Sequence, residues 1–227
     1  MIRYAQLTIP VHLSAVQAEV IALSEPWNPH FNTKHYEGEW TVLPLRVPGG
    51  DGNRIIPDNI GDEAVLDTPQ MAACPSIAQL ISTMHCPILS VRLLKLTSGA
   101  IIKPHRDHEL SFENGEARLH FPVVTNDAVE FYIEDELLRM REGECWYINA
   151  NLKHSVANKG NSDRIHLVVD CKVNGWLQDV FSNANKNYVP QSAQREQTLQ
   201  VIQSLRMLGT ETGERLAKEL EDGLLTQ

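Results

Sequence analysis

Between residues 88 and 173 the chain is a succession of short apolar segments separated by turn residues, and this pattern constrains the fold more than any other. Segments such as LSVRLLKL, ARLHFPVV and DRIHLVVDCKV have the length and β-branched content of strands, and Ser98-Gly99 and Asn126-Asp127 mark turns between them. About eight strands at this spacing favour an antiparallel sandwich or barrel, with a jelly roll as the leading case. The sequence therefore predicts a mainly β fold.

Helical patterns flank this region on both sides. Residues 12–24 carry apolar side chains at helical spacing, and residues 75–85 predict a helix that starts at Pro75. Residues 193–208 and 212–225 predict two more helices near the C-terminus. We expect a β domain with N-terminal helices over residues 1–190 and a helical extension over residues 191–227. The last helices would pad an outer sheet face or form a homodimer contact.

Composition limits the function classes that the chain can belong to. Of 227 residues, 42% are hydrophobic and 22% charged, which is typical of a folded globular protein and excludes a disordered chain. The net charge of −9 argues against nucleic acid or an anionic membrane as the main partner. The first twenty residues lack the apolar core of a signal peptide, so we expect a cytoplasmic protein with reduced, mostly buried cysteines. Cys145 and Cys171 are expected to be core thiols.

The stretch KPHRDHELSF, residues 103–112, holds the first candidate metal ligands. His105 and Asp107 follow a predicted strand, and a two-residue spacing puts both side chains on one face of an extended segment. His154, in the distant segment NLKHSVAN, is the candidate third ligand. Two histidines and one carboxylate leave three open positions on an octahedral ion, which is the arrangement of non-haem Fe(II) oxygenases. The absence of cysteine from this set disfavours a structural zinc site.

Two predicted strands carry arginine and histidine on one face and apolar residues on the other. In RIHLVVD, Arg164 and His166 alternate with large apolar residues, and in RLHFPVV Arg118 and His120 do the same. An arginine that faces a cavity needs an anionic partner, because an unpaired buried charge is costly. A bound dicarboxylate cosubstrate would supply that partner through the planar guanidinium group of Arg164.

Taken together, these motifs resemble a known family. The order H-x-D, R-L-H, G-E-x-W, H-S and R-I-H-L-x-x-D, from Lys103 to Asp170, resembles the aspartyl/asparaginyl β-hydroxylase family, and most closely its bacterial L-proline cis-4-hydroxylase branch. The resemblance is strong over residues 88–173 and weak over residues 37–47. It implies a double-stranded β-helix, which is a cupin-like jelly roll, and a dioxygenase that uses Fe(II) and 2-oxoglutarate.

The resemblance also implies roles for individual residues. His105, Asp107 and His154 match the metal ligands, and Arg164 matches the residue that pairs with the distal carboxylate of 2-oxoglutarate. Arg118 and His120 match residues near the carboxylates of the cosubstrate and the substrate. No catalytic residue beyond the metal centre is required. The animal members lack the carboxylate ligand and carry an additional repeat domain, so Asp107 argues against their protein-domain substrates.

Other residues receive less specific expectations. Arg46, on a strand predicted over residues 37–47, is a candidate ligand of the substrate carboxylate, with a surface salt bridge as the alternative. The loop over residues 48–63 is rich in glycine and is either a lid over the barrel mouth or a plain connector. His108 and Arg106 are expected in solvent or at the pocket mouth, and Trp146 and His166 in the core or beside the site. The remaining histidines are expected to be structural or exposed: His12, His30, His35 and His85.

The favoured function is hydroxylation of a free, proline-like amino acid or another small carboxylate-bearing metabolite by O2. Arg118 and Arg46 favour a carboxylate on the substrate, because 2-oxoglutarate alone would not need these two further arginines. One alternative is an Asp or Asn β-hydroxylase that acts on a peptide or protein. A second alternative, from a different class, is a non-catalytic cupin-like sensor of a metal or ligand. A purely structural jelly roll would leave the triad and Arg164 unexplained.

Overall fold

The computed structural model describes residues 1–24, 26–56, 63–107 and 110–225. The chain forms two compact units, Ile2–Asn187 and Met1 with Tyr188–Gln227. The predicted domain boundary between residues 190 and 191 stays a prediction. Within the described part of the chain, no helix has the length and apolar character that crossing a membrane requires.

Within the described residues, the strands form two antiparallel sheets, one of nine strands and one of five. The larger sheet has the order β14-β1-β11-β8-β13-β6-β4-β2, with β5 paired to β4. Its members are β1 (Ile2–Leu7), β2 (Asn28–Pro29), β4 (Trp40–Pro48), β5 (Val65–Asp67), β6 (Ile88–Leu96), β8 (Glu116–Val124), β11 (Cys145–Ile148), β13 (Arg164–Lys172) and β14 (Asn185–Tyr188). The smaller sheet, β10-β9-β12-β7-β3, contains β3 (Tyr36–Glu37), β7 (Ile101–His105), β9 (Val129–Ile133), β10 (Glu136–Leu138) and β12 (His154–Asn158).

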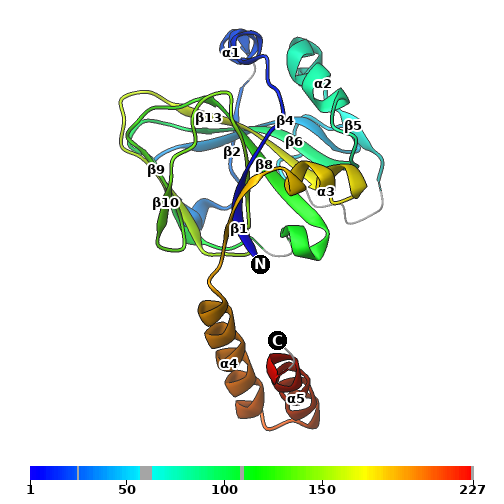
Figure 1. The fold of residues 1–227 in the computed structure, drawn as a ribbon. Coiled ribbons are helices and arrows are strands. Elements are labelled where there is room, and N and C mark those ends of the chain that lie inside the picture. The colour runs from blue at the N-terminus through cyan, green and yellow to red at the C-terminus, as the bar shows by residue number, and fades with distance from the viewer. Residues whose placement is uncertain (25, 57–62, 108–109, 226–227) are drawn as a thin grey trace. The chain divides into compact units, whose positions relative to one another are not determined.

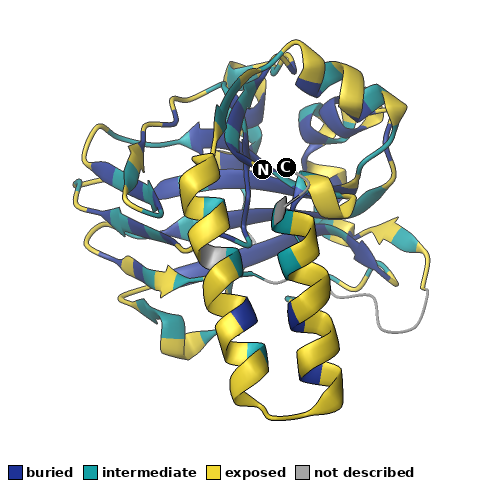
Figure 2. Ribbon diagram, turned by 60° about the horizontal axis from the view of Figure 1, so that its bottom comes forward, coloured by how far each residue is buried: buried dark blue, intermediate teal, exposed yellow. Residues whose placement is uncertain are grey.

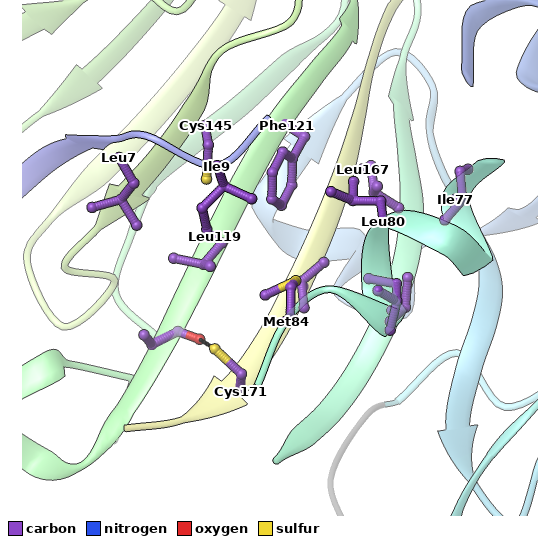
Figure 3. Packing of buried hydrophobic residues seen from close by; sticks show 14 of the residues in the cluster. Leu7, Ile9, Ile77, Leu80, Met84, Leu119, Phe121, Cys145, Leu167 and Cys171 are labelled. Carbon is purple, nitrogen blue, oxygen red and sulfur yellow. Dashed lines mark hydrogen bonds between the residues drawn. The ribbon is translucent and has the colours of Figure 1, made fainter. Parts of the chain in front are cut away.

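The larger sheet has one face covered by helices (Figure 1). α1 (Leu13–Ala22), α2 (Pro75–Ser82) and α3 (Gly175–Ser182) pack on this face. The core between the sheet and these helices includes Leu119, Phe121, Leu167, Ile77 and Leu80 (Figure 3). These strand residues are the apolar half of the alternation seen in the sequence, which is why this face collapses onto the helices.

The other half of the alternation places polar side chains on the opposite face of the central strands. β13 lies between β6 and β8, with Asp170 opposite Ser90 on β6 and opposite Arg118 on β8. Val168 is opposite both Arg92 and His120. Because side chains alternate along each strand, Arg118, His120 and the polar residues of β13 share one face. The cavity described below lies on that face.

The second unit contains a pair of helices, α4 (Gln191–Met207) and α5 (Glu211–Leu225). Most of their residues are exposed (Figure 2). Ile202 and Ala217 are buried. An ion pair of 2.6 Å between Arg206 and Glu221 joins the two helices. The two helices predicted over residues 193–208 and 212–225 are thereby confirmed. Their predicted roles, as padding or as a homodimer contact, stay predictions.

Most predicted elements are confirmed, and a few were missed. The mainly β, jelly-roll fold class with flanking helices is confirmed, and all four cysteines are free and buried. The strands β1, β2, β5 and β14 and the helix α3 were not predicted, and β3 was not separated from the strand predicted over residues 37–47. A usable signal for α3 was Asn174, whose side chain accepts a hydrogen bond of 3.1 Å from the Leu177 N–H and so caps the helix. Of the loop over residues 48–63, positions 57–62 lie outside the described residues, so its role as a lid stays a prediction.

Candidate functional site

A cavity of about 440 Å³ is lined by side chains from both sheets. This volume is in the range that is usual for small-molecule sites. The larger sheet contributes Trp40, Arg92, Arg118, His120, Ile148 and Arg164. The smaller sheet contributes Ile102, His105, Phe131, His154 and Val156. The cavity therefore combines guanidinium and imidazole groups with an apolar wall.

His105, Asp107 and His154 come together at one side of this cavity. Their ligand atoms lie within 4.8 Å of one another, which is close enough to hold one metal ion. His105 ends β7, His154 begins β12, and the two are direct partners in the antiparallel pairing of these strands. Asp107 follows two residues after His105, and its Oδ1 is 3.8 Å from His105 Nε2. The pairing of β7 with β12 thus brings together residues that are 49 positions apart.

Hydrogen bonds to the backbone orient both imidazole rings for metal binding. His105 Nδ1 is 2.8 Å from the Lys103 carbonyl oxygen, and His154 Nδ1 is 2.9 Å from the Leu152 carbonyl oxygen. A carbonyl can only accept, so each Nδ1 carries the proton and each Nε2 has a free lone pair. Donors of this kind, with one carboxylate, fit the set that non-haem Fe(II) uses.

The electrostatics of the three residues also suit a cation. Burial, helped by the neighbouring His105, lowers the pKa of His154 to about 4, so this imidazole is neutral at pH 7. Burial alone would raise the pKa of Asp107, but the guanidinium of Arg118, together with the neighbouring His154 and His105, outweighs it and holds that pKa below its usual value. The triad therefore presents the neutral imidazole of His154 and the carboxylate of Asp107 near neutral pH, with no proton to displace from either group.

A buried network of charges supports the metal side of the cavity. The Asp170 carboxylate accepts hydrogen bonds from Arg92 Nη2 (2.6 Å) and from Arg118 Nε (2.7 Å). Arg118 Nη1 in turn donates to Asp107 Oδ2. Burial alone would raise the pKa of Asp170, but the two guanidinium groups outweigh it and hold that pKa far below its usual range. These contacts connect a residue deep in β13 to a candidate metal ligand.

Arg164 is a buried cation of a different kind. Its side chain is 2% exposed, and its Nη2 donates to His166 Nδ1 at 2.8 Å. Its Nε has no partner among the described residues, and burial lowers the pKa of Arg164 to about 9 with no described carboxylate to oppose the effect. The guanidinium lines the cavity. A ligand with a carboxylate would satisfy both its charge and its unused donors.

His120 and His166 lie next to this arginine as neutral side chains. Burial, with the nearby Arg164, keeps the pKa of each far below its usual value. His166 Nδ1 accepts from Arg164 and is 3.5 Å from His120 Nδ1. His120 Nε2 is buried and has no partner within the described residues. His120 therefore has one nitrogen available to a ligand, whereas His166 supports Arg164.

The comparison with protein families agrees with this geometry. Residues 11–174 match the aspartyl/asparaginyl beta-hydroxylase family. The chain belongs to this family. The resemblance seen in the sequence is thereby confirmed, and the His-Asp-His set lies within the matched region.

Curated relatives and solved structures extend the comparison. The L-proline cis-4-hydroxylase of Rhizobium meliloti (strain 1021) is 27% identical over 153 residues, which are 66% of this chain and 53% of that protein. The L-proline cis-3-hydroxylase 2 of a Streptomyces species is 29% identical over 163 residues, 68% of this chain and 55% of that protein. The chain thus spans about half the length of the curated relatives it matches. A prolyl-4-hydroxylase structure from Pseudomonas putida is 10% identical, with a TM-score of 0.47, and covers 77% of this chain and 95% of its own.

Not every residue predicted for the site lies at the cavity. The structure brings together His105, Asp107, His154, Arg118, His120 and Arg164. Arg46 does not line the cavity; its Nε donates to Asp67 Oδ1 at 2.5 Å, and its role with substrate stays a prediction. Arg106 lines the cavity, while His108 lies outside the described residues. Trp146 is half-buried, with its indole N–H on Glu144 at 2.7 Å.

Among the cavity residues that were not predicted from the sequence are His30, Trp40 and Arg92. His30 stacks on Trp40 with ring centroids 3.5 Å apart, and both line the cavity. His30 has no motif around it, so no local signal separated it from the other isolated histidines. Arg92 had a signal that could have been used, because a charged residue in the apolar run LSVRLLKL implies a buried partner. That partner is Asp170.

Proposed function

We propose that this chain is an Fe(II)- and 2-oxoglutarate-dependent dioxygenase that hydroxylates a small, proline-like amino acid or a similar carboxylate-bearing metabolite. The observation that carries the proposal is Arg164, a buried cation without a described carboxylate partner in the wall of the cavity that holds the His-Asp-His set. A purely structural fold would gain nothing from such a charge. The names of the curated relatives, proline hydroxylases, support the same reaction class.

Each residue of the site has a definite part in this proposal. His105, Asp107 and His154 would hold Fe(II), and Arg164 would bind the distal carboxylate of 2-oxoglutarate. Iron and 2-oxoglutarate, when bound, supply the oxidation of a C–H bond by O2, with succinate and CO2 as the co-products. The chain itself orients the two ligands, excludes water and fixes which C–H bond faces the metal.

The charge of the cavity favours an acidic group on the substrate. Apart from the exposed Arg106, the arginines of the wall are Arg92, Arg118 and Arg164, with three positive charges. Asp107 and Asp170 carry two negative charges, so the buried part of the described wall and its support has a net charge of +1. Fe(II) and 2-oxoglutarate have opposite charges of equal size and leave this excess unchanged. A substrate carboxylate would balance it. The cavity volume of about 440 Å³ agrees with two small ligands.

A screen of free amino acids tests the proposal. The protein is loaded with Fe(II) without oxygen, mixed with 2-oxoglutarate and one amino acid in air, and succinate and hydroxylated product are measured. We expect succinate in step with product for proline or a close analogue, and neither for the His154→Ala variant. Succinate formed only with an Asp- or Asn-containing peptide would favour the peptide hydroxylase. Tight metal binding without succinate for any substrate would overturn the proposal in favour of a sensor.

A further inference from the structure

Among the described residues, Asp170 is the carboxylate near the candidate metal site that accepts the most hydrogen bonds. It lies two residues before the end of β13 and is 4% exposed. Ser90 Oγ donates to it at 3.0 Å and Arg92 Nη2 at 2.6 Å. Arg118 adds two bonds, from Nε at 2.7 Å and from Nη2 at 3.1 Å. The donors come from both neighbouring strands, β6 and β8, so Asp170 is held from two sides.

The two bonds from Arg118 fix the orientation of its guanidinium group. The group is planar and rigid, and a two-point contact with a carboxylate leaves it no rotation. Its remaining nitrogen, Nη1, then points at a defined place, where it donates to Asp107 Oδ2. Asp107 is thereby turned so that its other oxygen, Oδ1, is the one near His105 Nε2, at 3.8 Å.

We infer that Asp170 is a positioning residue for the metal site, acting through Arg118 to keep Asp107 Oδ1 directed at the metal. The inference rests on the proposed function only in taking Asp107 as a metal ligand. Asp170 itself is not one of the candidate metal ligands, and it is not among the described residues that line the cavity. It determines the geometry of Asp107 because a free Asp107 side chain could rotate and present either oxygen, or neither.

A purely structural role is the competing explanation, because the Arg92–Asp170–Arg118 cluster also joins three strands. Removing Asp170 alone would leave Arg92 buried and unpaired, and such a protein could fail to fold. A better variant removes both partners, because apolar residues of similar volume often replace a buried ion pair without loss of stability. Arg92→Met/Asp170→Leu fulfils this condition and leaves Arg118 with Asp107 as its remaining carboxylate.

The matched control is Arg92→Met alone, which keeps the two-point contact between Asp170 and Arg118. Co²⁺ is titrated into the full-length wild type, the control and the double variant without 2-oxoglutarate, and the dissociation constant and the visible absorption of bound Co²⁺ are recorded. Melting temperatures are measured on the same samples. Asp107→Ala gives the signal expected when the carboxylate ligand is lost.

We expect the double variant to bind Co²⁺ about 10- to 100-fold more weakly than the Arg92→Met control. Loss of a residue that supports a metal ligand commonly weakens metal binding by this factor. Its absorption should move toward that of Asp107→Ala, while its melting temperature stays close to that of the control. Equal affinity and equal spectra in the double variant and the control would overturn the inference and leave the proposed function intact. A wild type that binds no Co²⁺ would overturn both.

Discussion

Replacing Arg164 with methionine should stabilise the ligand-free protein and weaken 2-oxoglutarate binding at the same time. Arg164 is 2% exposed and has no described carboxylate partner, and burial lowers its pKa to about 9. A depression of this size corresponds to a destabilisation of the charged form on the order of 2 to 5 kcal/mol. Methionine has a similar length and no charge, so this cost disappears in the variant.

One smaller effect reduces the net gain in stability. The variant loses the donor to His166 Nδ1, which removes about 1 kcal/mol. We therefore expect a net gain of about 1 to 4 kcal/mol in the free energy of unfolding. For a chain of this size, each kcal/mol changes the melting temperature by about 2 to 4 °C. The melting temperature of the ligand-free protein should accordingly rise by about 2 °C or more.

The effect on the cosubstrate has the opposite sign. Truncation of one partner of a buried charge pair removes about 2 to 5 kcal/mol of binding free energy, which is a loss of roughly 30-fold or more in 2-oxoglutarate affinity. Calorimetric titration with Mn²⁺ at the metal site measures this affinity, and Mn²⁺ affinity itself should change little. Arg46→Met is the matched control, because Arg46 pairs with Asp67 at the surface and neither quantity should change.

Two outcomes for stability and 2-oxoglutarate affinity would contradict this prediction. A methionine variant that is less stable than the wild type, and that still binds 2-oxoglutarate with wild-type affinity, would show that Arg164 has a structural partner and no ligand. Loss of stability together with equal loss of metal and cosubstrate binding would point to misfolding.

Two more predictions follow from the histidines of the cavity. His154→Ala should abolish tight binding of Fe(II) or Co²⁺ and leave the circular dichroism spectrum unchanged. His85→Ala, at an exposed position, is the control. Unaltered metal binding by the His154→Ala variant would show that His154 is not a metal ligand. Burial chiefly lowers the pKa of His30 to about 3, below the unfolded value near 6.5, so the unfolded state binds the extra proton between these pH values. This part of the stability is complete above pH 6.5 and is lost as the pH falls toward 3. Urea unfolding between pH 7.5 and 4.5 should show a slope that His30→Gln reduces by up to about 1.4 kcal/mol per pH unit, and an unchanged slope would contradict the assignment.

Local patterns were sufficient for the elements and for much of the candidate site. The alternation in RLHFPVV and RIHLVVD predicted which side chains share a face, because the side-chain period of a strand is fixed by backbone geometry. The two-residue spacing of His105 and Asp107 predicted a shared face for the same reason. His154 was predicted as the third metal ligand because it stands just before a predicted strand. The pairing of β7 with β12 places it opposite His105.

Other features depended on which strands become neighbours, and no local pattern specifies this. Arg92 and Arg118 meet Asp170 only because β6 and β8 flank β13, and the network to Asp107 follows from that order. The same order leaves Arg46 paired with Asp67 away from the cavity, while His30 reaches the cavity by stacking on Trp40. The sequence by itself determined the faces of each strand, since the period of two is local. Only the tertiary structure decided the partners of each charge, because these depend on long-range pairing and on the need of every buried charge for a counterpart.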